Sequence, residues 1–290
     1  AIRRQRQMCI RDRSMRIDIV SLFPEFFDAF FSHSIIKRAI EAERLSMAVT
    51  NPRDFSHNKH GQVDDTPYGG GAGMLMMAPP IFEAVESVIA QYDNTVNSTY
   101  TTDEMCDEMS LIGNPSESIR RRIIFMGPTG QPFTQEKARE LATYDQIVLI
   151  CGHYEGVDYR VEEHLVDETI SIGDYVLTGG ELPAMVVADA VARMIPGVLG
   201  AASGAQEDSF YEPLLECPQY TKPPEFRGWV VPDVLRSGHH KNIATWRQKE
   251  ALKRTRLLRP DLLERPLTKE EIKLLKEIIA EESERDIGEV

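Results

Sequence analysis

Glycine is concentrated in one stretch that could bring the backbone close to a small molecule. Gly173, Gly179 and Gly180 fall within eight residues and interrupt two short apolar runs, at 168–172 and 175–177. Glycine lacks a Cβ atom, so its backbone can approach another group closely or adopt a positive φ angle. Two tight turns between core elements would need the same residues. Taken alone, the stretch leaves a binding site and a pair of structural turns equally open.

A second glycine cluster, YGGGAG at 68–73, lies in a long polar stretch at 51–73. Connections of this length are more often functional than idle. A phosphate-binding loop would need a Gly-Lys-Ser/Thr motif, or a G-x-G-x-x-G that opens a helix after a strand, and the cluster has neither. The sequence therefore argues against a nucleotide hydrolase or a dinucleotide-dependent dehydrogenase.

Charged side chains follow the first glycine stretch and could move protons. Asp189 and Arg193 are four residues apart in a predicted helix, which is also the spacing of a surface ion pair worth about 0.3–0.5 kcal/mol. Asp208 follows in a segment with loop composition, where aspartate commonly caps or turns the chain. Spacing alone favours these structural roles for both Arg193 and Asp208.

Composition sets limits on what the chain can be. A chain of 290 residues can bury a sizeable core in one or two domains. Its net charge of −13 argues against a generic nucleic-acid binder, so any RNA binding must rely on local charge. The four cysteines show neither metal-ligand spacing nor a disulfide framework. Asp189 and Arg193 interrupt the most apolar helix. We therefore expect a cytoplasmic protein without a membrane span.

The elements that would position these residues alternate between strand, turn and helix. Strands are predicted at 16–22, 123–126, 146–151 and 168–172, and helices at 25–45, 79–91, 134–143 and 184–195. This alternation is typical of a parallel α/β sheet, whose functional sites lie at the strand ends.

Two segments are predicted to lie outside this pattern. Residues 1–14 are basic and lack the apolar region of a signal peptide, so we interpret them as a leader, upstream or cloning-derived, outside the fold. Residues 91–122 are predicted to be a solvated insertion loop, because acids recur from Asp93 to Glu117 without a lysine or arginine.

The composition changes again toward the C-terminus. Residues 200–214 are interpreted as a linker, and 215–290 as a small all-helical domain. The basic residues of this domain concentrate in one run: Arg236, Lys241, Arg247, Lys249, Lys253, Arg254, Arg256 and Arg259. Glu250 is the one acid between them. Thr268 and Glu271 have the spacing of a capping box, which predicts a final helix.

Five long motifs follow one another along the chain: MRIDIVSLFPEFF at 15–27, NPRDFSHNKHGQVDDTPYGGGAGMLMM at 51–77, CGHYEGVDYRV at 151–161, SIGDYVLTGGELPAM at 171–185 and EDSF at 207–210. Together they resemble the bacterial tRNA (guanine-N1-)-methyltransferases of the SPOUT superfamily, and the resemblance covers nearly everything after residue 14. It implies an α/β domain at 15–199 with a deep C-terminal trefoil knot. It also implies a homodimer whose active site is completed across the interface, and a tRNA-binding domain at 215–290.

The activity implied by the resemblance is methyl transfer from S-adenosylmethionine to N1 of guanine 37, just 3′ of the tRNA anticodon. The cofactor contacts it implies are Pro128, Gly152, Ile172, Gly173, Asp174, Tyr175, Val176, Leu177, Gly179, Gly180 and Pro183. S-adenosylmethionine has no phosphate, so it needs an apolar slot and backbone groups for its adenine rather than a helix N-terminus. Glycine turns at successive strand ends could supply both.

Guanine N1 carries a proton near neutral pH, so its methylation calls for a base and for a donor that stabilises charge growing on O6. The resemblance assigns the base to Asp208 and the cation to Arg193, and it puts Glu155 against the guanine. The glycine-rich residues Tyr68, Gly69, Gly70 and Gly71 are expected near the RNA. A requirement for Mg²⁺ is also implied, but no cage of carboxylates in the sequence locates a metal site.

Two alternatives stay open. A related SPOUT-type enzyme could methylate a different RNA atom, such as a ribose 2′-oxygen. A non-catalytic RNA-binding module would also use the basic run at 236–259.

Overall fold

Five parallel strands form the central sheet of the first part of the chain. They are β1 (Met15–Val20), β2 (Leu45–Thr50), β5 (Arg121–Pro132), β6 (Gln146–Cys151) and β7 (Glu168–Ser171), in the order β2-β1-β6-β5-β7. The computed structural model describes residues 14–102, 119–199 and 208–288. The chain divides into two units, residues 1–202 and 203–290, and the sheet lies in the first. The predicted parallel α/β architecture is confirmed.

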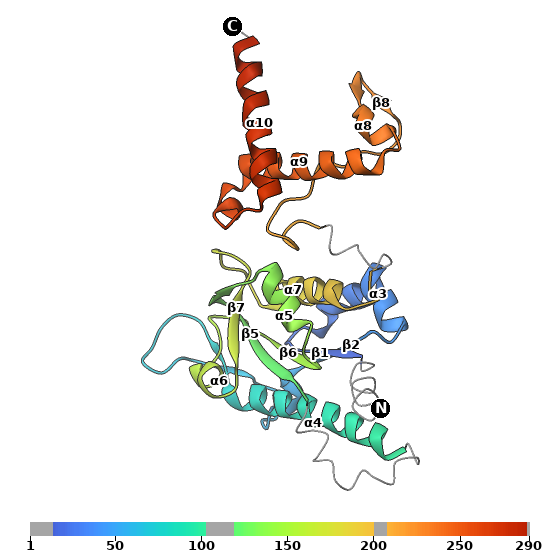
Figure 1. Ribbon diagram of the computed structural model, residues 1–290. Helices are drawn as coiled ribbons and strands as arrows, with labels where there is room; N and C mark the ends of the chain where they lie inside the picture. The colour runs from blue at the N-terminus through green and yellow to red at the C-terminus, as the bar shows by residue number, and fades with distance from the viewer. Residues whose placement is uncertain (1–13, 103–118, 200–207, 289–290) are drawn as a thin grey trace. The chain divides into compact units, whose positions relative to one another are not determined.

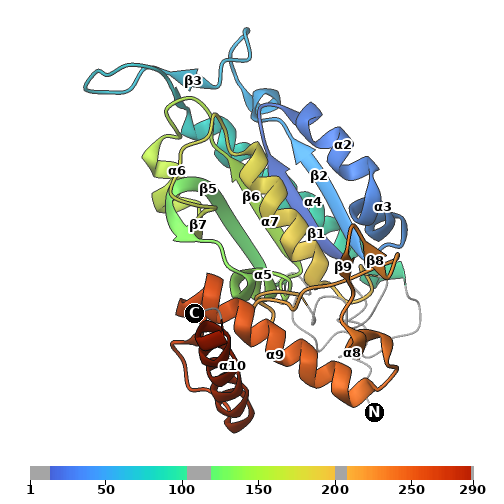
Figure 2. The ribbon, with the colours of Figure 1, turned by 90° about the horizontal axis from the view of Figure 1, so that it is seen from above.

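Helices cover both faces of the sheet (Figures 1 and 2). One face carries α2 (Asp28–Ser32), α3 (Ser34–Glu41), α5 (Gln135–Leu141) and α7 (Glu181–Met194), and the other carries α4 (Ala78–Thr102) and α6 (Tyr159–His164). Strand β6 is buried throughout: Ile147 and Leu149 pack into one core, and Val148 and Ile150 into the other. Side chains alternate across a strand, so a strand covered on both faces has to be apolar at every position.

The predicted helix at 25–45 is wrong in its continuity. The segment forms the 3-10 helix η1 (Pro24–Phe27), α2 and α3, and then strand β2, which was not predicted. Ser34 and Glu43 have φ angles of 55° and 54°, which interrupt a right-handed helix. Leu45 is 1% exposed and pairs with Met15 at the start of β1. Residues 45–50 therefore form a strand rather than the end of a helix, because they pair with the distant strand β1.

The predicted insertion loop at 91–122 is also wrong at both ends. Helix α4 continues through Thr102, and β5 begins at Arg121. The helix extension is held by contacts that composition does not reveal: Val96 is buried, the Tyr92 hydroxyl donates to the Asp145 carbonyl, and Asp93 pairs with Arg121. Residues 103–118 lie outside the described part of the chain, as do residues 1–13 of the predicted leader.

The long polar stretch after β2 contains the 3-10 helix η2 (Pro52–Phe55) and a two-stranded ribbon, β3 (Asp64–Asp65) with β4 (Leu75–Met76). Figures 1 and 2 both show the segment that links β3 to β4, residues 66–74, projecting from the body of the first unit. We call this segment the projecting arm. The glycines in this projecting arm have positive φ angles, among them Gly69 (88°) and Gly70 (80°). Glycine tolerates this conformation without the steric penalty that a Cβ brings.

The second unit consists mainly of helices: α8 (Asp233–Arg236), α9 (His240–Leu258), the 3-10 helix η5 (Pro260–Leu263) and α10 (Lys269–Gly288). It is not all-helical, because β8 (Glu225–Phe226) and β9 (Trp229–Val230) form a short hairpin. Leu252 of α9 and Leu274 and Ile278 of α10 are buried together, with Leu214 packed against them. Leu214 was predicted to be in the linker, yet it belongs to this core.

The capping box at the start of α10 is confirmed. The Thr268 amide donates to Oε2 of Glu271 (2.7 Å), and the Glu271 amide donates to Oγ1 of Thr268 (3.2 Å). Over residues 14–102, 119–199 and 208–288, the helices are all too short or too polar to cross a membrane.

Candidate functional site

A cavity of about 140 Å³, partly open to solvent, lies at the ends of β6 and β7 and beside the register shift of β5. Ten of the eleven residues that the motifs assigned to a cofactor line it; they are Pro128, Gly152, Ile172, Gly173, Tyr175, Val176, Leu177, Gly179, Gly180 and Pro183. Asp174 does not. The carboxyl ends of neighbouring parallel strands meet at one edge of a sheet, which is where open α/β folds place ligands. The sheet order therefore brings together residues up to 55 positions apart.

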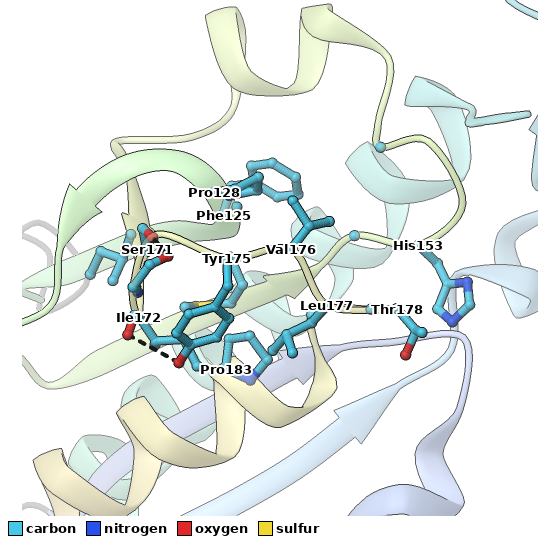
Figure 3. Close-up of a pocket in the computed structure, with 18 of the residues that line it drawn as sticks. Phe125, Pro128, His153, Ser171, Ile172, Tyr175, Val176, Leu177, Thr178 and Pro183 are labelled. Carbon is cyan, nitrogen blue, oxygen red and sulfur yellow. Dashed lines mark hydrogen bonds between the residues drawn. The ribbon is translucent and has the colours of Figure 1, made fainter.

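Segment 172–180 forms one wall of this pocket (Figure 3). The Tyr175 hydroxyl donates to the Ile172 carbonyl (3.3 Å), and the Ser171 hydroxyl both donates to the Gly173 carbonyl (3.0 Å) and accepts from the Gly173 amide (3.2 Å). Val176 is 83% exposed and Leu177 38% exposed. Local hydrogen bonds thus hold the wall, and it presents exposed apolar side chains.

Gly180 allows the first turn of α7 to pack on the end of β6. Its amide donates to the Gly152 carbonyl (2.8 Å), and a Cβ on Gly180 would lie 2.6 Å from Cα of Cys151. Gly180 has a φ of −82°, and Gly179 is outside the left-handed region as well. Of the three glycines in this stretch, only Gly173 has a positive φ angle (152°), and Gly180 serves the close approach of backbone instead.

A buried carboxylate, that of Glu181, also holds the first turn of α7 in place. Glu181 is 4% exposed and accepts a hydrogen bond from the Ser21 hydroxyl (2.7 Å), which ties α7 to the end of β1. Burial raises the pKa of the neighbouring Cys151 thiol well above its ordinary value, and the Glu181 carboxylate raises it further. Cys151 is therefore a protonated core residue rather than a nucleophile.

His153 lines the pocket although the motifs assigned it no cofactor contact. Its ring lies 4.9 Å from that of Phe23 and 5.2 Å from that of Tyr154. Its Nδ1 atom is buried and has no hydrogen-bond partner in the described part of the chain. The signal that could have found it is its place two residues after a fully buried strand.

Eight more residues that line the pocket were not predicted from the sequence. They are Phe125, Met126 and Gly127 on β5, Ile170 and Ser171 on β7, and Tyr154, Gly156 and Thr178 in the loops. Ile170 and Ser171 are the last residues of β7, and Phe125 to Gly127 lie where the pairing of β5 with β7 shifts in register.

Glu155 lies in the pocket as predicted for a substrate contact. Its amide donates to the Met74 carbonyl (3.1 Å), and its side chain lies against Gly73, where a Cβ would overlap it. The base of the projecting arm therefore meets the pocket. Tyr68 and Gly69 to Gly71 lie in the same arm without lining the pocket, and Tyr68 is fully exposed.

The two predicted catalytic residues lie in different units. Arg193 is on the last turn of α7, whose first turn carries the pocket residue Pro183; ten residues of helix separate them by about 15 Å. Asp208 belongs to the second unit, where it lines a groove with Arg247 of α9. Among residues 14–102, 119–199 and 208–288 no three His, Cys, Asp or Glu side chains gather as metal ligands would. The roles of Arg193 and Asp208 stay predictions.

Comparison with known proteins agrees with the motifs. Residues 15–265 match the family tRNA (Guanine-1)-methyltransferase TrmD. A tRNA (guanine-N(1)-)-methyltransferase of Desulforamulus reducens is 54% identical over 265 residues, 91% of this chain and 95% of that protein. Proteins of the same name from Brevibacillus brevis (52% over 265 residues, 91% and 98%) and Dehalococcoides mccartyi (50% over 270 residues, 93% and 99%) are similar as well. This chain belongs to the tRNA (Guanine-1)-methyltransferase TrmD family.

Proposed function

We propose that this protein transfers a methyl group from S-adenosylmethionine to N1 of guanine 37, just 3′ of the anticodon in tRNA. Family membership supports a tRNA guanine-N1 methyltransferase. The observation that carries the cofactor assignment is the convergence of ten motif residues on one pocket at the strand ends. A tRNA substrate also suits a protein that works in the cytoplasm.

The lining of the pocket suits the chemistry of the proposed cofactor. The pocket has apolar walls, formed by Ile170, Ile172, Leu177 and Pro183. Gly152, which follows β6, has no side chain to cover its backbone groups. Apolar walls with a few polar groups are what an adenosine moiety requires. When bound, S-adenosylmethionine would supply an electrophilic methyl group, and the protein has to hold the acceptor nitrogen in line with it.

The protein's own residues then have to handle one proton and one growing charge. We propose that Asp208 takes the N1 proton, that Arg193 stabilises negative charge developing on O6, and that Glu155 orients the guanine. Glu155 lies in the pocket at the foot of the glycine-rich arm, so the arm is suited to hold the RNA beside it. The assignment of Asp208 and Arg193 rests on the motifs EDSF and ELPAM with the helix that follows. A site for Mg²⁺ stays unassigned.

A homodimer would explain the position of Arg193. At about 15 Å along α7 from Pro183, Arg193 lies far from the pocket of its own protomer. Leu182 and Val186 on the same helix are 53% and 46% exposed, and Asp189 is exposed as well. Apolar side chains at this spacing suit a helix that packs on a second copy. We propose that the partner's α7 completes the site.

The trefoil knot is part of the same proposal. Strand β7 is separated from β6 by β5, and β5 extends past a register shift to pair with β7 again at Gln131 and Pro132. After β7 the chain returns to the end of β6, where Gly179 bridges His153. This return past the β5 extension supports the proposal, because a trefoil knot requires the chain to thread through a loop formed by an earlier segment.

Nucleoside analysis tests the function. The full-length protein is incubated with S-adenosylmethionine and an unmodified tRNA transcript carrying guanine 37, and the digested RNA is analysed by mass spectrometry. We expect 1-methylguanosine, and none with a transcript that carries adenine at position 37. A 2′-O-methylated nucleoside would point to the ribose-methylating alternative. Tight tRNA binding without any methylated nucleoside would point to a binding module.

A further inference from the structure

A short hairpin in the second unit exposes an aromatic surface that the proposed reaction does not use. In the β8–β9 pairing, Phe226 lies directly opposite Trp229, and Glu225 opposite Val230. Directly opposite residues point to the same face of a hairpin, so Phe226 and Trp229 share one face. Their rings lie 6.1 Å apart at 48°. They are 56% and 70% exposed.

The hairpin is not part of a core. All six residues from 225 to 230 are exposed, although a two-stranded hairpin on its own is at best marginally stable in water. Its two-residue loop, Arg227-Gly228, has positive φ angles of 54° and 83°. Type I′ turns favour asparagine, aspartate or glycine at the first position, so an arginine there is an unusual choice. Exposed aromatic area on a small hairpin is typical of a contact surface.

The chemistry of the loop selects the kind of partner. The guanidinium group of Arg227 lies over the Phe226 ring, 5.2 Å from its centre. Nearby in the chain, Tyr220 packs on Trp246 of α9, with ring centres 6.4 Å apart. Flanking basic residues are Lys222, Arg236 and Lys241, against the acids Glu225 and Asp233. Aromatic rings interleaved with arginine, on a locally basic segment of an acidic chain, suit a nucleobase stacked beside its phosphate.

We propose that the β8–β9 hairpin is a stacking platform that binds an unpaired nucleobase of the tRNA. This inference rests on the proposed function, because it takes tRNA as the substrate. Phe226 and Trp229 supply the stacking surface, and Arg227, whose guanidinium lies over the Phe226 ring, would face the backbone phosphate of the stacked nucleotide. The hairpin adds to affinity for tRNA and has no part in proton or methyl transfer.

Equilibrium binding of the full-length protein to unmodified tRNA tests the platform. Trp229→Ala and Phe226→Ala should each weaken binding by about 5- to 150-fold, the range for loss of one stacked base. Val230→Ala is the matched control, since Val230 is 55% exposed on the opposite face of the same hairpin, and it should leave Kd unchanged. The slope of log K against log salt should stay the same in the aromatic variants, because stacking releases no counterions.

Two further measurements keep this proposal separate from the proposed function. At saturating tRNA the methylation rate of Trp229→Ala should equal that of the parent protein. A parent protein that binds tRNA but forms no 1-methylguanosine would contradict the reaction and leave the platform standing. A Kd within twofold of the parent for both aromatic variants would overturn the platform. Weaker self-association of Trp229→Ala without RNA would also overturn it, because the surface would then be a protein interface.

Discussion

Gly180 lies where the first turn of α7 meets the end of β6, and backbone atoms surround it. A Cβ there would lie 2.6 Å from Cα of Cys151 and 2.9 Å from the amide nitrogen of Gly152, and backbone cannot move aside as a side chain can. We predict that Gly180→Ala lowers stability by about 1–3 kcal/mol, the usual cost of overpacking, and weakens S-adenosylmethionine binding. Calorimetric titration and thermal unfolding measure the two effects.

Gly179→Ala is the matched comparison. The atoms that its Cβ would meet belong to the side chains of Glu181 and His153 rather than to the backbone. Its effect on cofactor binding should be the smaller of the two. Equal, parent-like affinity in both variants would show that the turn tolerates a side chain and that the cofactor lies elsewhere.

The proposed roles of Asp208 and Arg193 predict an effect on the rate of methyl transfer rather than on the affinity for cofactor or tRNA. Asp208→Asn keeps the shape and removes the base, so single-turnover methyl transfer should slow by roughly 10²–10⁴-fold, while cofactor and tRNA binding change little. Arg193→Ala should also slow the step, and the double variant should lose less than the product of the two effects. If Arg193 is only a structural residue, its removal will cost stability and spare the rate. Near-parent rates in Asp208→Asn would make Glu155 the next carboxylate to test.

At the scale of elements, the N-terminus of α10 is held by a carboxylate with three donors around it. Hydrogen bonding from Arg265, and then from Thr268, lowers the pKa of Glu271 from 4.5 to about 2, although burial opposes the shift. A carboxyl whose pKa is lower in the folded state stabilises the fold above its unfolded pKa and loses that contribution as pH falls toward the folded value.

We predict that Glu271→Gln lowers the free energy of unfolding of the second unit by about 1–3 kcal/mol at pH 6. The difference from the parent protein should hold down to about pH 4.5 and shrink between pH 4.5 and 2. Denaturant unfolding at several pH values measures it. Glu270→Gln, on an exposed neighbour in the same turn, is the control and should show little change. A difference that does not depend on pH in this window would mean that the carboxylate is not the stabilising group.

Helix α9 carries most of the basic run, and the structure divides that run into two kinds of residue. Lys249 pairs with Glu277 and Glu281 of α10, and Arg256 pairs with Glu282. Arg247 and Arg254 are exposed on the same helix. We predict that Arg247→Gln and Arg254→Gln each weaken tRNA binding and reduce the slope of log K against log salt by about 0.7–0.9. Filter binding over a range of salt concentrations measures this.

Lys249→Gln is the internal control, because its charge is already balanced within the second unit. It should lower stability slightly and leave the salt slope unchanged. The composition of the run therefore overstated the number of charges that α9 can offer to phosphates. An equal change of slope for all three variants would mean that the ion pairs with α10 open when tRNA binds.

For the whole molecule, the separation of Arg193 from its own pocket predicts a dimer with shared sites. Sedimentation at micromolar concentration should give a mass twice that of the chain. Mixing Arg193→Ala protein with the pocket-impaired Gly180→Ala protein should restore activity, since a mixed dimer combines an intact pocket with an intact Arg193. A monomer in sedimentation, or no recovery on mixing under conditions that exchange subunits, would contradict the shared site.

The sequence by itself determined the features that depend on local or repeating patterns. Strand β6 was predicted residue for residue, because a strand buried on both faces must be apolar throughout. The capping box of α10 was predicted because its hydrogen bonds join residues three apart. The motifs also named eleven residues of the pocket before any geometry was known, ten as cofactor contacts and Glu155 as a substrate contact.

Only the tertiary structure decided what depends on distant partners. Strand β2 exists because Leu45 meets β1, and α4 extends to Thr102 because Asp93 and Tyr92 find Arg121 and Asp145. Gly180 is required because backbone from β6 lies against it, and His153 joins the pocket because its strand ends there. Each of these contacts joins residues 28 to 53 positions apart, or elements that only the sheet order makes neighbours. Such contacts leave no periodic trace in the sequence, since their free energy is gained only after the chain has closed the loop between them.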